Sequence, residues 1–80
     1  MKVEIITPDA TLFTGDQVNL VQLPGIDGSF EVLNHHAPLI SVLTKGKIKI
    51  LIAGEKEPLW FEIKGGVIEV LRDKVLILAE

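Results

Sequence analysis

Apolar and polar residues alternate along most of this chain with a period of two. Residues 47–52 show the pattern most clearly, with an isoleucine at every second position. Similar alternation runs through residues 2–6, 17–23 and 58–64. A period of two is typical of half-buried β-strands, and no stretch has the 3.6-residue period of an amphipathic helix. The pattern therefore predicts a protein built from short strands.

Turn-forming residues separate these runs. Clusters rich in Gly, Pro, Asn, Asp and Lys recur roughly every eight to ten residues, at positions 7–9, 15–16, 24–28, 34–38, 45–46, 53–56, 65–66 and 72–74. Residues 39–45 are the only competitor for a helix, and they are short and rich in β-branched side chains. The spacing predicts one all-β domain over residues 1–80, a sandwich of about eight to ten short, mostly antiparallel strands.

The alternation also predicts which side chains share a face. In the run 17–23 it places Val18 with Leu20 on one face and Val21 on the other. Adjacent Trp60 and Phe61 must point to opposite faces of their strand. We expect one of the two aromatic rings in the core. The other is either covered by neighbours or exposed as an anchor for a partner.

The composition contains more apolar residues than a small monomer needs. Hydrophobic residues make up 48% of the 80, and the mean hydropathy is +0.41. A domain of this size buries only about 60–65% of its unfolded surface. Part of the apolar surface is therefore expected to be exposed and to serve a partner.

Charge argues against nucleic acid as that partner. Eleven acidic and eight basic residues give a net charge of −3, and no basic footprint with interleaved aromatics is present. Lys45, Lys47 and Lys49 form a stripe on one strand face, which indicates a solvated edge or, as the alternative, contact with an acidic protein surface. No apolar run approaches the ~20 residues of a membrane span, and the N-terminus does not resemble a signal peptide. We therefore expect a cytoplasmic protein without direct membrane insertion.

The residues of greatest chemical interest do not form a recognisable active site. His35 and His36 are adjacent, so a regular strand would point them to opposite faces, and no further metal ligands lie at a suggestive spacing. Ser29 and Ser41 could be paired with a His and Asp27, but neither serine lies in a nucleophile elbow. There is no cysteine to act as a nucleophile or thiolate ligand. We expect no catalytic residue and no metal.

The glycine-rich turns do not have the pattern of a cofactor-binding site either. The 24–28 turn has only two glycines and no helix after it, so it is not a dinucleotide-binding loop. We expect no cofactor. The turn is better explained as a fixed loop tip, and loop tips on rigid β scaffolds often carry recognition.

Several segments, taken in order, resemble one family. The first is residues 21–30, Val-Gln-Leu-Pro-Gly-Ile-Asp-Gly-Ser-Phe, followed by His-Ala-Pro-Leu at 36–39. The others are Thr-Pro-Asp at 7–9 with Leu-Phe-Thr-Gly at 12–15, residues 43–50, residues 65–70 and residues 74–80. Together they resemble the N-terminal β domain of the epsilon subunit of F-type ATP synthases, over essentially all 80 residues.

The resemblance implies a β-sandwich of about ten strands and a non-catalytic role in the rotor. In that family the domain lies at the foot of the central stalk, between the gamma subunit and the ring of c subunits. It would help gamma and the ring to turn together during ATP synthesis driven by protons or sodium ions. The implied location is peripheral, on the cytoplasmic face of the bacterial inner membrane, with the other ATP synthase subunits as further partners.

The resemblance also assigns contact residues. Ile26, Asp27, Gly28 and Ser29 would face the polar loops of the c ring. The side that faces gamma would carry Thr7, His36 and Ser41.

The chain departs from the family pattern in two ways. His35 stands where the family usually has glycine, and Ser29 where many members carry an acid, so the charge that faces the ring is expected at Asp27 or Glu31. Most bacterial relatives continue beyond the position of Glu80 into a helical hairpin that can restrain ATP hydrolysis. We expect the chain, as it stands, to lack that brake and its ATP site.

A second function class remains open on the residues alone. A free-standing β-sandwich that binds a small ligand or a peptide through its 24–38 loops would show the same composition and turns.

Overall fold

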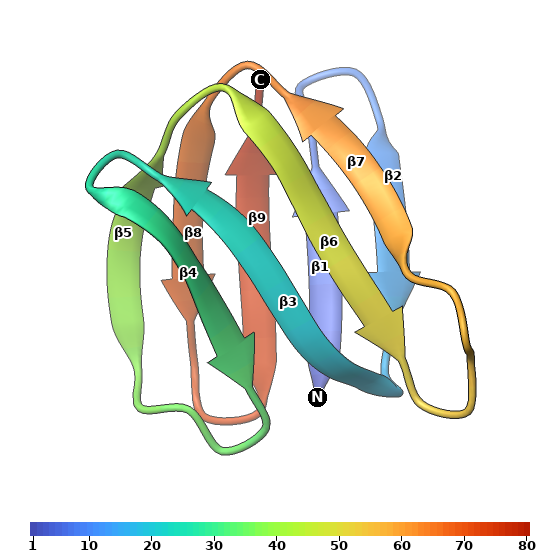
Figure 1. Cartoon of the computed structure of the whole chain (residues 1–80). Helices are drawn as coiled ribbons and strands as arrows, with labels where there is room; N and C mark the ends of the chain where they lie inside the picture. The colour runs from blue at the N-terminus through green and yellow to red at the C-terminus, as the bar shows by residue number, and fades with distance from the viewer.

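The computed structural model describes all 80 residues and consists of strands without a helix (Figure 1). No segment is therefore a helix that could span a membrane. The nine strands are β1 (Lys2–Ile6), β2 (Thr11–Gly15), β3 (Val18–Gly25), β4 (Gly28–Leu33), β5 (Leu39–Leu43), β6 (Gly46–Ile52), β7 (Leu59–Ile63), β8 (Gly66–Val70) and β9 (Lys74–Ala79). The prediction of an all-β chain with eight to ten short strands is confirmed.

The strands form one curled sheet that folds over on itself into two layers (Figure 1). The first layer has the order β2-β1-β9-β8-β5, and the second has the order β4-β3-β6-β7. One residue pair, Gly25 with Leu43, joins β3 to β5 and so connects the layers along one side. All neighbouring strands are antiparallel except β1 and β9, which pair in parallel.

The two layers enclose a small aliphatic core. Fifteen hydrophobic residues are buried, and no polar or charged residue is buried with them. On the side opposite the β3–β5 contact, Phe13 of β2 and Phe61 of β7 lie against each other with ring centroids 5.7 Å apart. Both rings pack on the core, so they close the open side of the sandwich where two edge strands meet.

The face assignment of Val18 was wrong. Val18 is 1% exposed and belongs to the core with Val21, although strict alternation places it on the opposite face. The register of β3 against β6 shifts between Val18 and Leu20, which pair with consecutive residues of β6. Such a bulge adds one residue and reverses the phase of the alternation.

Residues 39–43 form strand β5, which excludes the helix considered as the alternative for residues 39–45.

The connections gather at the two ends of the sandwich (Figure 1). The C-terminal end carries the β1–β2, β3–β4, β5–β6 and β7–β8 turns together with Glu80. The N-terminal end carries Met1 and the other four connections. The α-amino group of Met1 donates hydrogen bonds to the carbonyl oxygen of Val18 at 2.9 Å and to Asn34 Oδ1 at 2.8 Å. The N-terminus is thereby fixed to the second layer.

One glycine of β8 lies where an added side chain would meet the backbone of β9. Gly66 pairs with Ala79 and has a φ of +150°. A Cβ at this position would collide with the carbonyl oxygen of Leu78 and would lie 3.0 Å from the Cα of Ala79. These obstacles are backbone atoms of a central strand, so they cannot move without distorting the sheet.

We expect Gly66→Ala to lower the free energy of unfolding by about 2–4 kcal/mol, because a steric clash adds to the strained φ. Urea denaturation followed by tryptophan fluorescence measures this loss. Gly54→Ala is the matched control: Gly54 also has a positive φ, +82°, but a Cβ there meets open space. The control should lose only about 1 kcal/mol. Equal losses would show that the close approach of β8 and β9 is unimportant.

Candidate functional site

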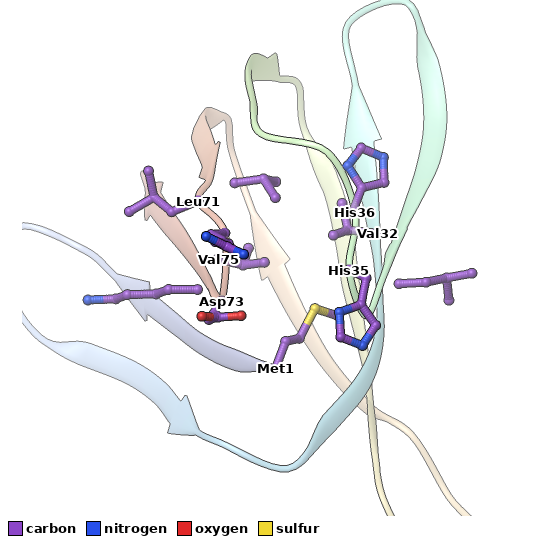
Figure 2. A pocket seen from close by; sticks show the side chains of 11 residues that line it. Met1, Val32, His35, His36, Leu71, Asp73 and Val75 are labelled. Carbon is purple, nitrogen blue, oxygen red and sulfur yellow. The ribbon is translucent and has the colours of Figure 1, made fainter.

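The structure contains no pocket that could enclose a small ligand. The crevice between Met1, the two histidines and the β8–β9 turn has a volume of only ≈ 10 Å³, which is about enough for one water molecule (Figure 2). The other hollows are open grooves on the surface. No group of three or more His, Asp or Glu side chains lies where it could hold a metal ion. Surfaces are therefore the candidate sites.

The two histidines lie in the tight turn between β4 and β5, at the N-terminal end. The backbone N–H of His36 donates to the carbonyl oxygen of Leu33 at 3.2 Å, which closes a four-residue turn. His35 occupies the third position of that turn with a φ of +65°. Positive φ at the third position alone defines a type II turn, which normally takes Gly or Asn there. His36 Nδ1 lies 2.6 Å from the carbonyl oxygen of Ala37, so Nδ1 donates and Nε2 is left free.

The tip between β3 and β4 is exposed but firmly held. Ile26 and Asp27 form a two-residue turn between the paired Gly25 and Gly28, and the side chain of Ile26 is 60% exposed. The N–H of Ile26 donates to the carbonyl oxygen of Val42 at 3.2 Å. Just below the tip, the N–H of Thr44 donates to the carbonyl oxygen of Pro24 at 2.8 Å. These bonds fasten the tip to the end of β5 and to the residue that follows it, so the predicted loop tip is preorganised.

The outer surface of the first layer is largely apolar. Residues that pair across neighbouring strands direct their side chains to the same face of the layer. On the outer face these side chains form two rows across β5, β8, β9 and β1. The row toward the C-terminal end contains Val42, Val67, Leu78 and Ile6, and the next row contains Ile40, Glu69, Leu76 and Glu4. We call these eight residues the outer apolar face.

No part of the chain covers the outer apolar face. The side chain of Ile40 is 72% exposed, and those of Leu78 and Val42 are 51% and 50% exposed. A shallow groove of ≈ 160 Å³ runs between Ile40, Val67, Leu76 and Leu78. Exposed apolar side chains that adjoin in this way are typical of protein-interaction surfaces.

Two carboxylates lie among these apolar side chains. Glu4 forms a salt bridge with Lys74, in which Glu4 Oε1 lies 2.8 Å from Lys74 Nζ. The hydrogen bond from Lys74 lowers the pKa of Glu4 below its ordinary value of 4.5, although partial desolvation opposes the shift. Glu69 is half-buried beside Ile40 and Leu76. The face therefore combines apolar contacts with acidic groups that could orient a partner.

The residues predicted to face gamma do not form one cluster, and of the three Thr7 lines a groove with Ile6, Val67 and Leu78 of this face. Thr7 lies at the C-terminal end, where its hydroxyl bonds the backbone of Ala10 and closes the β1–β2 turn. His36 lies at the opposite end, just before β5. Ser41 lies within β5 opposite the buried Ile68, so it is directed to the inner side of the layer.

The second layer has a more polar outer surface. Lys49 pairs with Trp60 across β6 and β7, and its ammonium group lies 5.7 Å from the centroid of the indole ring. Phe61 packs against the core, whereas Trp60 is 54% exposed. The two aromatic residues therefore point to opposite faces as predicted, and Trp60 is the exposed one.

Sequence reasoning missed the outer apolar face as a site. Its signal is present in residues 39–43 and 75–79, which read Leu-Ile-Ser-Val-Leu and Val-Leu-Ile-Leu-Ala. These runs are apolar on both phases of the alternation, which indicates strands with apolar residues on both faces. In a two-layer sandwich one of those faces must be outside.

Comparison with known proteins identifies the family. The family model "ATP synthase, Delta/Epsilon chain, beta-sandwich domain" matches residues 1–80. The ATP synthase epsilon chain of Chlorobium limicola is 35% identical over 79 residues, which are 99% of this chain and 88% of that relative. The epsilon chain of Chlorobaculum tepidum is 39% identical over 77 residues, with 96% and 85% covered. The epsilon chain of Dehalococcoides mccartyi strain BAV1 is 38% identical over 80 residues, which are 100% of this chain and 55% of that relative.

Solved structures share the fold. A chain from the central stalk and c ring of the Tetrahymena thermophila mitochondrial ATP synthase matches with a TM-score of 0.83 at 21% identity, over 98% of this chain and 61% of that one. A chain from the Euglena gracilis mitochondrial ATP synthase, in a structure of OSCP, F1 and the c ring, matches with a TM-score of 0.88 at 20% identity, over 96% and 48%. The β-sandwich prediction is confirmed, and the protein belongs to the beta-sandwich family of ATP synthase delta and epsilon chains.

Proposed function

We propose that this protein is a non-catalytic rotor subunit of a bacterial F-type ATP synthase, which joins the gamma subunit to the c ring. The observation that carries the proposal is the outer apolar face, which the chain leaves uncovered. Relatives named as ATP synthase epsilon chains match almost the whole chain, and the structural neighbours come from assemblies that contain the c ring. A subunit held between two partners needs two docking surfaces, and this sandwich offers two.

The gamma subunit is proposed to cover the outer apolar face. Thr7 lines a groove with Ile6, Val67 and Leu78 at one edge of this face. His36 lies in the turn before β5, and Ser41 lies within β5 but is directed inward. The apolar rows would supply most of the binding energy, because exposed Ile, Val and Leu side chains gain most when a partner removes water from them. Glu69, in the centre, would fix the register of a cationic group on gamma.

The c ring is proposed to contact the tip formed by Ile26, Asp27, Gly28 and Ser29. Ile26 provides an exposed apolar contact, and Asp27 provides the charge. The two backbone hydrogen bonds that join this tip to Val42 and Thr44 already restrict its conformation. The tip would therefore lose less conformational entropy on binding the polar loops of the ring.

This arrangement makes the protein a rigid mechanical connector. Its core is continuous and aliphatic, so a force applied at the tip passes through packed strands to the outer apolar face. The proposed location is the cytoplasmic face of the bacterial inner membrane, where the subunit would be attached through its partners. Either protons or sodium ions could drive such a rotor, because no ion crosses this subunit.

Reversing the charge of the tip should weaken attachment to the ring. We expect Asp27→Arg to reduce the affinity of a complex of this chain with gamma for detergent-solubilised c ring by about tenfold, since an exposed charged contact in an interface is replaced by a repulsive one. Surface plasmon resonance on immobilised ring measures the change. Asp9→Arg is the matched control, because Asp9 carries the same charge in another turn of the same end. Equal binding by both variants would disprove the tip assignment.

Placing a charge on the outer apolar face should weaken binding to gamma without unfolding the chain. We expect Ile40→Asp to weaken binding to purified gamma by about tenfold to a hundredfold, because the carboxylate would be desolvated against apolar groups. Isothermal titration calorimetry measures the affinity.

Trp60→Asp provides the control for that substitution. Trp60 is 54% exposed on the outer surface of the second layer, so the same carboxylate there should leave binding to gamma unchanged. If Trp60→Asp weakened binding and Ile40→Asp did not, gamma would cover the opposite layer.

A further inference from the structure

We propose that gamma places one cationic side chain, an arginine or a lysine, against Glu69 within the outer apolar face, and that this ion pair makes the protein selective for a gamma that carries the cation. The inference rests on the proposed function and deepens it, because it names the group on gamma that the face requires and the reason for the requirement.

Glu69 is a carboxylate without a partner in the chain. It is half-buried, and its neighbours across the sheet are the apolar Ile40 of β5 and Leu76 of β9. Its side chain makes no hydrogen bond, and the one salt bridge of the protein joins Glu4 to Lys74. In the free chain, therefore, only water can satisfy the carboxylate oxygens of Glu69.

A cation of the chain that lies within reach of this row is already engaged. Leu76 pairs with Glu69 on one side and with Glu4 on the other, and Lys74 lies two residues before Leu76 on the same strand. A long side chain in such a diagonal position can reach either neighbouring strand. Lys74 is bound to Glu4 at 2.8 Å, so the chain neutralises Glu4 and leaves Glu69 uncompensated.

Binding of gamma would remove the water from Glu69. A partner that packs on Ile40 and Leu76 also covers the carboxylate that lies between them. Desolvating an ionised carboxylate is costly unless an opposite charge replaces the water. A gamma without a cation at this point would therefore bind poorly, and Glu69 would act against such a partner.

The groove beside Glu69 suits a long cationic side chain. Glu69 lines this groove of ≈ 160 Å³ together with four apolar residues, Ile40, Val67, Leu76 and Leu78. The methylene stem of an arginine or a lysine packs well on apolar walls while its charged end reaches a polar group at their edge. An arginine could also bind both carboxylate oxygens at once.

The test measures the dissociation constant for purified cognate gamma by isothermal titration calorimetry with Glu69→Gln and Glu69→Leu. Both variants should bind at least about thirtyfold more weakly than wild type, because each leaves the cation of gamma buried without its partner. Neither should melt below wild type, since Glu69 makes no bond within the chain. Glu62→Gln and Glu62→Leu are the matched controls. Glu62 is an exposed carboxylate of β7 in the second layer, so both should bind as wild type does.

The direction of the change in Glu69→Leu decides the matter. If gamma carried no cation there, this variant would bind more tightly than wild type, because it removes a carboxylate that loses its water on binding. Tighter or unchanged binding would therefore overturn the inference. Weaker binding by Glu69→Leu alone, with wild-type affinity in Glu69→Gln, would indicate a neutral donor on gamma and would also overturn it. The proposed function fails separately, if wild type does not bind gamma or if Ile40→Asp binds equally well.

Discussion

A two-layer sandwich of 80 residues has only one interior, and this limit shapes every surface of the protein. Each strand directs half of its side chains inward, and fifteen aliphatic residues fill the space between the layers. None of the nine strands forms a third layer. Strands β5 and β9 carry apolar side chains on both of their faces. Only one face of each strand is directed into the core, so the apolar side chains of the other face must lie outside. The outer apolar face follows directly from that limit.

The same compactness fits the proposed rotor role. The layers are joined through backbone at the β3–β5 contact and through Phe13 and Phe61 on the other side. At Gly66 the backbone of β9 leaves no space for a side chain on β8. A body closed on both sides deforms little under load. Function can then reside in loops and one exposed face, while the core only holds them in position.

The sequence was sufficient for the architecture because alternation and turn residues act locally. The strands, their turns and the opposite directions of Trp60 and Phe61 follow from a period of two, whereas the exposure of Trp60 was found only in the structure. The burial of Val18 could not be predicted, because the bulge that reverses its phase depends on pairing with β6, about 30 residues away.

The candidate site was less predictable than the fold for a related reason. Thr7, His36 and Ser41 were expected on one side, yet their separation depends on which strands become neighbours. The inward direction of Ser41 and the alignment of Val42 with Val67 and Leu78 are consequences of register between distant strands. The positive φ of His35 required the structure, and the sequence showed only a histidine where the family usually has glycine.

The composition of the native complex tests the central claim most directly. Membranes from the source organism would be extracted with mild detergent, the ATP synthase captured through a tag on gamma, and the intact complex weighed by native mass spectrometry. The account predicts one copy of this protein for each gamma, released together with gamma when the c ring is dissociated. An intact complex that contains gamma and the c ring, while this protein remains in the unbound fraction, would contradict it.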